Sequence, residues 1–192
     1  MSIQFKGYLK DTEQLKKSKV DGLNQLEVKW IDYFLAFIII IYPLLRSIKL
    51  LVSKYNGQLS DVILADIAGF IIIIILMVIH EYLHAMTFSK NEEINIWIHG
   101  FGMITHCTQR KNIKSYIFTF LFPNLVIALP LSIFVSINFI LEPLILKTIG
   151  LISSIILLGT ISDISYIICI VRNGKNISYL QFSGENLYFR KK

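Results

Sequence analysis

The sequence predicts an all-α fold: a polytopic membrane protein with about four transmembrane helices and a short β-hairpin on the cytoplasmic side. The apolar content of the 192 residues is 54%, above the roughly 45–50% of ordinary soluble domains. The apolar residues come in long runs with few charges, which is typical of membrane spans. Only one segment between two of these runs alternates apolar and polar residues, as a strand does.

Four of the apolar runs approach the roughly 20 residues that a helix needs to cross the bilayer core. They cover residues 31–52, 62–88, 117–141 and 144–171. A buried helix of a soluble protein would keep a polar face, whereas residues 71–77 are Ile and Leu followed by Met, without any polar residue. The runs are therefore predicted to be transmembrane helices.

Polar segments flank the spans and divide the chain into three parts. Residues 30–172 form the predicted transmembrane domain, between a cytoplasmic N-terminal tail of residues 1–29 and a cytoplasmic C-terminal tail of residues 173–192. The N-terminal tail lacks the pattern of a cleavable signal peptide, and is expected to be either a solvated leader or a short amphipathic helix. The apolar face of that helix would hold Leu15, Val20, Leu23 and Leu26. Residues 185–190 copy most of an engineered protease-cleavage site, and their native origin stays open.

The positive charges predict the orientation of the chain in a cell membrane. The formal net charge is +6, which by itself would also fit a nucleic-acid-binding surface. With the N-terminus inside, however, all 19 Lys and Arg residues fall on the cytoplasmic side except Arg46, Lys49, Lys54 and Lys147. This asymmetry favours a cytoplasmic location for both termini, and it explains the basic surplus as an orientation signal. The two cysteines, Cys107 and Cys169, are expected to be free thiols.

A β-hairpin is predicted between the second and third spans. Residues 94–99 alternate in the manner of a strand, residues 100–102 interrupt the pattern with two glycines, and residues 103–106 complete the hairpin. In the third span, Pro123 and Pro130 are expected to kink the helix.

The second span carries the pattern His80-Glu81-x-x-His84. Residues four apart lie on one face of a helix, so both imidazoles can bind a single ion, with zinc–nitrogen distances of about 2.0–2.1 Å. Glu81 lies about 100° around the helix from His80, where it can reach a water on the metal without binding the metal. The pattern predicts a Zn²⁺ cofactor bound by His80 and His84, with Glu81 as the catalytic general base of an HExxH-type zinc metallopeptidase.

A catalytic zinc site has three protein ligands and one open position, so the histidine pair needs a further ligand. Lys90 stands where an extended motif of the type His-x-x-Gly-x-x-His has its third histidine, which excludes that class. The remaining candidates are Asp163, His99, His106 and Glu142.

Features of residues 62–180 occur together in a known family: His80-Glu81-Tyr82-Leu83-His84-Ala85, the glycine-containing hairpin, Pro123, and Gly159-Thr160-Ile161-Ser162-Asp163-Ile164. The chain resembles the integral-membrane zincin-type metallopeptidases, a bacterial family distantly similar to the site-2 proteases. Site-2 proteases take their third zinc ligand from an Asp in a late transmembrane helix, and the resemblance assigns that role to Asp163. Their frequent Asn-x-x-Pro-x-x-Asp-Gly pattern is absent, since Ile164 follows Asp163.

The depth of Asp163 in the membrane gives a second reason to assign it as the third ligand. His80 lies ten residues before Lys90, the first basic residue beyond its span, or about 15 Å of helix. Asp163 lies nine residues before Arg172, or about 13.5 Å. Both spans run in the same direction, so the two groups are expected at nearly equal depth.

The sequence thus predicts an intramembrane zinc metalloprotease that hydrolyses a peptide bond of a membrane-embedded or juxtamembrane substrate. Asn124 is a candidate for substrate binding, although an interhelical hydrogen bond is the simpler role. Two alternatives stay open. One is a non-catalytic metal-binding membrane protein for transport or immunity, which a closed site with four protein ligands would favour. The other is a metal-dependent membrane hydrolase that acts on lipid or prenylated substrates. The expected partners are a membrane protein or peptide and membrane lipid, and not nucleic acid. No feature indicates the oligomeric state.

Overall fold

The structure is a computed structural model that describes residues 2–10, 15, 21–52, 58–89, 92–100, 102–137, 141–183 and 186–191. The N-terminal amphipathic helix, one of the two alternatives for the tail, falls partly outside these residues, at Val20. Its other apolar residues, Leu15, Leu23 and Leu26, do not lie in a helix.

Four helical segments are long and apolar enough to cross a membrane. They are α1 (Trp30–Leu51), α2 (Leu59–Met86), the segment Ile113–Ser136 and α5 (Pro143–Asn173). Each overlaps one of the predicted runs and differs from it by a few residues at its ends. By length and composition, the four predicted spans are therefore present in the fold.

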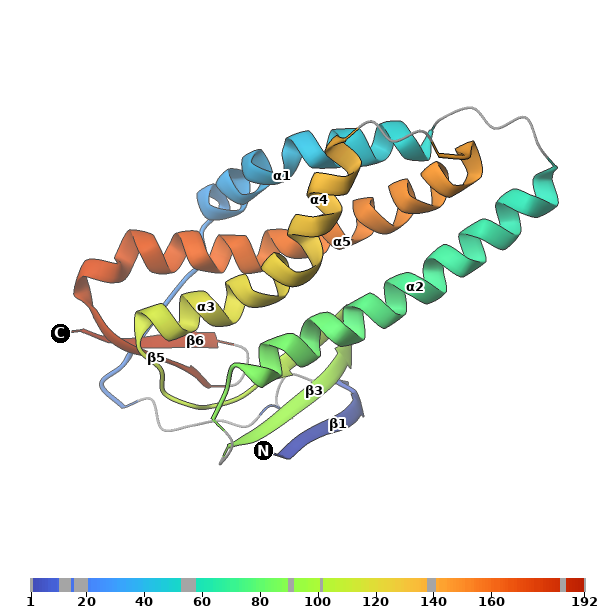
Figure 1. The fold of residues 1–192 in the computed structure, drawn as a ribbon. Coiled ribbons are helices and arrows are strands. Elements are labelled where there is room, and N and C mark those ends of the chain that lie inside the picture. The colour runs from blue at the N-terminus through green and yellow to red at the C-terminus, as the bar shows by residue number, and fades with distance from the viewer. Residues whose placement is uncertain are drawn as a thin grey trace.

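The third of these segments is bent, as its prolines predict (Figure 1). It comprises α3 (Ile113–Pro123), the π-helix η2 (Asn124–Ala128) and α4 (Leu129–Ser136). Pro130 has no N–H to donate to the preceding turn, and its ring crowds the carbonyl group there. The wider π-turn just before Pro130 accommodates this missing bond, and Asn124 is its first residue.

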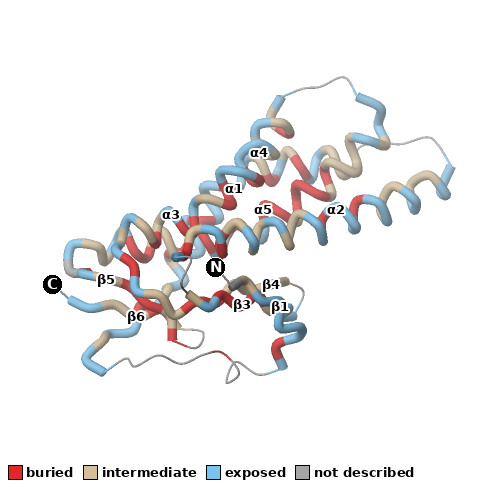
Figure 2. The backbone as a smooth tube through the Cα atoms, turned by 60° about the horizontal axis from the view of Figure 1, so that its bottom comes forward, coloured by how far each residue is buried: buried red, intermediate tan, exposed pale blue. Residues whose placement is uncertain are grey.

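Helices α1 and α5 pack so closely that only glycine fits at position 150. A Cβ atom at Gly150 would lie 2.5 Å from the backbone nitrogen of Leu51 and 2.7 Å from the carbonyl oxygen of Ser47. Small residues permit such close approach between membrane helices. By contrast, most of α2 is exposed or half-buried, and its last turns hold the buried residues His84 and Ala85 (Figure 2).

Two three-stranded sheets lie at one end of the helices (Figure 1). The first has the order β1-β3-β4, with β1 (Ser2–Tyr8) parallel to β3 (Glu93–His99), and β3 antiparallel to β4 (Gly102–His106). The second has the order β2-β6-β5, all antiparallel, and comprises β2 (Asn24–Gln25), β5 (Ile177–Ser183) and β6 (Asn186–Lys191). The predicted hairpin is confirmed as β3 and β4, with Gly100 at a φ of +57° in its turn.

The predicted all-α class is therefore incomplete, because the chain is mostly helical but also builds these sheets. Both predicted tails supply strands: β1 and β2 come from residues before α1, and β5 and β6 come from residues after α5. Leu180 and Leu187 of the second sheet are buried with Tyr116 of α3 and Cys169 of α5. This small core fixes the second sheet against the ends of two helices. Both cysteines are buried and neither forms a disulfide bond, as expected.

Candidate metal centre

Three ligand atoms from two helices meet near the end of α2. His80 and His84 lie one turn apart on the same face of α2, and Asp163 lies on α5. The Nε2 atoms of the two histidines are 3.2 Å apart. Oδ2 of Asp163 lies 3.1 Å from Nε2 of His80 and 3.4 Å from Nε2 of His84. We call these three residues the metal triad.

The hydrogen bonds around the metal triad direct its lone pairs toward one point. Nδ1 of His84 lies 2.9 Å from the carbonyl oxygen of Thr119. Because a carbonyl only accepts, Nδ1 carries the proton, and Nε2 of a neutral ring presents a lone pair to the other two ligands. Asn124 supports the third ligand, since its Nδ2 donates to Oδ2 of Asp163 at 2.9 Å.

The spacing of these atoms fits a tetrahedral zinc ion. Ligand atoms about 2.0–2.1 Å from a tetrahedral ion lie about 3.3 Å from one another, close to the three separations in the metal triad. Two imidazole nitrogens and one carboxylate oxygen form a donor set that zinc accepts, and they leave a fourth position for water. The residues present therefore fit the ion that the sequence predicts.

Glu81 lies beside the metal triad without belonging to it. With Asp163 it lines two cavities, of about 300 Å³ and about 350 Å³. Thr105 of β4 donates a hydrogen bond from Oγ1 to the carbonyl oxygen of Glu81 at 2.8 Å, which holds the hairpin against α2 at this point. The Glu81 carboxylate is thus positioned next to the metal triad, in a space that a water or a substrate can enter.

The two cavities share part of their lining, and we call them the two arms of the cleft. The shared residues are Glu81, Met103, Ser162 and Asp163. The first arm has aromatic walls and contains Phe88, Phe120, Tyr166 and Phe182, together with the buried Leu15 from the N-terminal segment. The second arm has aliphatic walls and contains Met77, Ile155, Ile156 and Gly159. The reacting groups therefore lie between two apolar recesses of different shape.

The other candidate ligands do not join the metal triad. His99 is exposed at the end of β3, and Glu142 is the N-cap of α5, at the start of the helix that carries Asp163 near its other end. His106 is buried on β4 and lines the first arm of the cleft, so the hairpin does fold inward. Asn124 makes an interhelical hydrogen bond to Asp163, and a role in substrate binding stays a prediction.

Sequence reasoning missed a group of polar residues behind His84. Lys111, Thr87 and Thr119 lie around the end of α2, and Lys111 is buried although its sequence position suggested an orientation signal at the membrane surface. Burial lowers the pKa of the Lys111 ammonium to about 8, and the Cys107 thiol beside it acts in the opposite direction. No spacing or motif in the sequence marks these three residues as neighbours.

A comparison with protein families agrees with this geometry. The model of a family described as "putative zincin peptidase" matches residues 73–178, a segment that contains His80, Glu81, His84 and Asp163. No curated protein and no solved structure matches the chain. Since the matched segment is more than half of the 192 residues, the chain belongs to this zincin peptidase family.

Proposed function

We propose that the protein is an intramembrane zinc metalloprotease that hydrolyses a peptide bond of a membrane-embedded or juxtamembrane substrate. The observation that carries this proposal is the metal triad, with ligand atoms 3.1–3.4 Å apart and the Glu81 carboxylate next to it in a cleft. A structural metal site has no need of an adjacent free carboxylate or of an open position, whereas hydrolysis needs both.

Each residue of the site has a separate role in the proposed reaction. His80, His84 and Asp163 would hold a zinc ion, which would act as a Lewis acid and lower the pKa of a bound water. Glu81 takes a proton from the attacking water and later delivers it to the leaving amine, so it acts first as base and then as acid. Thr119 keeps the His84 ring in the tautomer that leaves Nε2 free.

The location of the metal triad supports a substrate that lies in or beside a membrane. His80 lies six residues before the end of α2 at Met86, or about 9 Å of helix. His80 therefore lies within a helix that is long and apolar enough to cross the bilayer. It lies toward the end where the sheets pack, and we infer that cleavage occurs near that face. Two histidines on one span and an Asp on a later span also fit the expected likeness to site-2 proteases.

Metal content and turnover test the proposal together. The purified wild-type protein should hold one zinc per chain by elemental analysis, and His80→Ala or His84→Ala should lose it because each removes a ligand. Glu81→Gln should retain zinc while hydrolysis of a transmembrane peptide library, followed by mass spectrometry, falls by about 10²–10⁴-fold.

Glu142→Gln is the matched control, because Glu142 caps the far end of α5 and should leave both properties unchanged. A wild-type protein prepared in the presence of zinc that carries none would refute the metal site. Full turnover by Glu81→Gln would refute the assigned base.

A further inference from the structure

A buried ammonium group lies behind the metal triad. The side chain of Lys111 is buried between the end of α2 and the first turns of α3. Its Nζ donates to the carbonyl oxygen of Thr87 at 2.8 Å, to Oγ1 of Thr87 at 3.1 Å and to Oγ1 of Thr119 at 2.8 Å. It also lies 3.7 Å from the centroid of the Phe88 ring. Among the described residues no carboxylate pairs with it, so its partners are neutral.

The partners of Lys111 lead directly to His84. Thr87 donates from Oγ1 to the carbonyl oxygen of His84 at 2.8 Å. Thr119 accepts from Nδ1 of His84 through its carbonyl oxygen at 2.9 Å, and its hydroxyl lies 2.8 Å from that of Thr87. The Lys111 ammonium therefore connects Thr87, which is the C-cap of α2, to Thr119, which orients the His84 ring.

The place of this contact on α2 suits a cation. Thr87 is the C-cap of α2, and carbonyl groups in the last turn of a helix lack intrahelical partners and carry partial negative charge. The backbone of Lys111 is itself fixed, because its N–H donates to Leu180 at 3.0 Å and its carbonyl accepts from Leu180 at 2.8 Å. The ammonium is thus held between β5, α2 and α3.

Burying this charge opposes folding, as the lowered pKa of Lys111 shows. A methionine would fill a similar volume without that cost, but it would leave the Thr87 carbonyl and the two hydroxyls without their common donor. Lys111 therefore contributes hydrogen bonds to Thr87 and Thr119 that an apolar side chain of the same volume could not make.

We propose that Lys111 is a positioning residue of the metal centre, which ties Thr87 and Thr119 into one unit and thereby fixes the direction in which His84 presents Nε2. This inference rests on the proposed metal site. It adds that the site depends on Lys111, a residue outside the HExxH motif. Residues that orient a metal ligand through a hydrogen bond typically change metal affinity by about 10–100-fold when they are lost.

Metal affinity measures this role without reference to turnover. Zinc affinity, by competition with a chromogenic chelator, should fall about 10–100-fold in Lys111→Met. The visible absorption of the Co²⁺-loaded protein should change in band position, because the His84 ring moves. Thr119→Val, which removes the hydroxyl at constant shape, should weaken binding similarly, and Thr119→Ser should restore it. In the double variant Lys111→Met/Thr119→Val, little further loss is expected because both changes break the same unit.

Lys114→Met is the matched control, since Lys114 is exposed in the first turn of α3 and the variant should bind zinc like the wild type. If Lys111→Met and Thr119→Val lower the thermal midpoint but keep wild-type zinc affinity and an unchanged Co²⁺ spectrum, Lys111 is only structural and the inference is overturned. Independent, additive losses in the double variant would also overturn it. A wild-type protein without metal affinity would overturn the proposed function itself, which is a different result.

Discussion

At the scale of single residues, the carboxylate of Asp163 is held by a neighbour from a third helix. Asn124 donates from Nδ2 to Oδ2 of Asp163 at 2.9 Å and to the carbonyl oxygen of Phe120 at 2.8 Å. The side chain therefore connects the first turn of the π-helix to Asp163, the proposed third ligand. Rigid support of this kind keeps a ligand in place before the ion arrives.

We expect Asn124→Leu to weaken zinc binding by about 10-fold, because Asp163 loses its hydrogen-bond donor while the side-chain volume is nearly kept. Chelator competition measures the change. Asn173→Leu is the matched control, since Asn173 makes a similar amide bond to the carbonyl oxygen of Cys169 at a distance from the metal triad. Unchanged zinc affinity with lost turnover would instead place Asn124 at the substrate.

Lys111 should also make the stability of the protein depend on pH. Its pKa is about 8 in the fold and about 10.4 in an unfolded chain. Between these values the unfolded chain binds more protons, so the free energy of unfolding rises with pH. Below pH 8 both states are protonated, and the cost of burying the charge is present in full.

We therefore expect the wild type to gain stability relative to Lys111→Met by up to about 2 kcal/mol between pH 8 and about 9.5. Thermal unfolding in detergent at several pH values measures this difference. A difference between the two proteins that stays constant over this range would contradict the assigned pKa.

The sequence predicts the metal triad and its neighbour Glu81 from a few separate observations. His80, Glu81 and His84 follow from helix periodicity. Asp163 follows from the resemblance to the zincin-type metallopeptidases and from its distance to the end of its span. Lys111 shows the limit of such reasoning, because a lysine beside an apolar segment usually marks the membrane surface. Its burial depends on where the end of α2 meets the start of α3, which is a tertiary contact without a sequence pattern.

At the scale of elements, the close contact between α1 and α5 depends on Gly150. We expect Gly150→Ala to lower the free energy of unfolding by about 1–3 kcal/mol, because the new Cβ would overlap backbone atoms of Leu51 and Ser47 that cannot turn away. The thermal midpoint in detergent measures the effect. Gly159→Ala is the control: its Cβ would meet open space, and alanine favours the helix. Equal midpoints for the two variants would contradict the packing described here.

The four apolar helices are predictable because each is a continuous apolar run in the sequence. Recognising such a run does not require knowledge of any other element. The terminal strands are different, since β1 pairs with β3 and β2 pairs with β6, far along the chain. Short strands with mixed polarity gain their stability from such distant partners. The segment of β6 resembles an engineered cleavage site in sequence, yet its Leu187 is a core residue of the fold.

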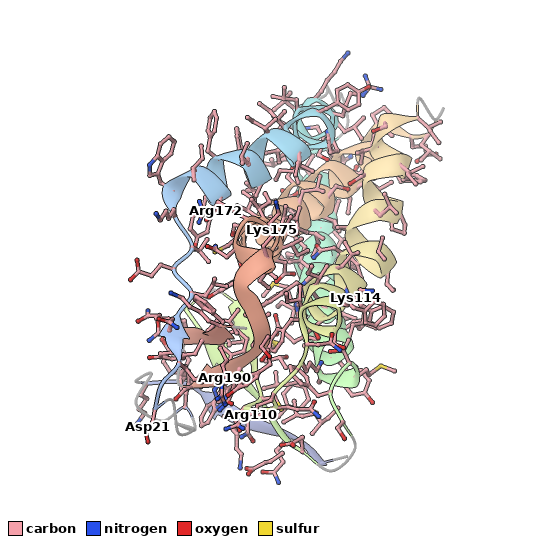
Figure 3. The ribbon with its side chains drawn as sticks, turned by 90° about the vertical axis from the view of Figure 1, so that its left-hand side faces the viewer. Asp21, Arg110, Lys114, Arg172, Lys175 and Arg190 are labelled. Atoms are coloured by element: carbon pink, nitrogen blue, oxygen red, sulfur yellow. The ribbon has the colours of Figure 1, made fainter. Side chains whose placement is uncertain are left out.

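At the scale of the whole molecule, a group of basic residues lies at the end that holds the sheets (Figure 3). Lys114 lies in the first turn of α3, while Arg172 and Lys175 lie at the end of α5. Arg110 stacks over Tyr179 of β5 at 5.2 Å, and Arg190 lies opposite Tyr179 in β6. The sheets and these charges therefore share one side of any membrane that the helices cross.

We predict that this side is the cytoplasm, because positive residues are retained there. Fluorescent-protein fusions at either terminus should be fluorescent, and alkaline phosphatase fused after residue 55 should be active outside. The opposite result for all three fusions would invert the orientation and leave the fold unchanged.

The parallel pairing of β1 with β3 bears on how the protein is made. During translation β1 leaves the ribosome first, but its partner follows only after α1 and α2 have been synthesised. The second sheet forms later still, since β2 needs β6, which follows α5. Asp163 is likewise synthesised after α1, α2 and α3, because it lies on α5. A nascent chain that has not yet reached α5 therefore holds an incomplete cleft, and the proposed hydrolysis can begin only after α5 has been made.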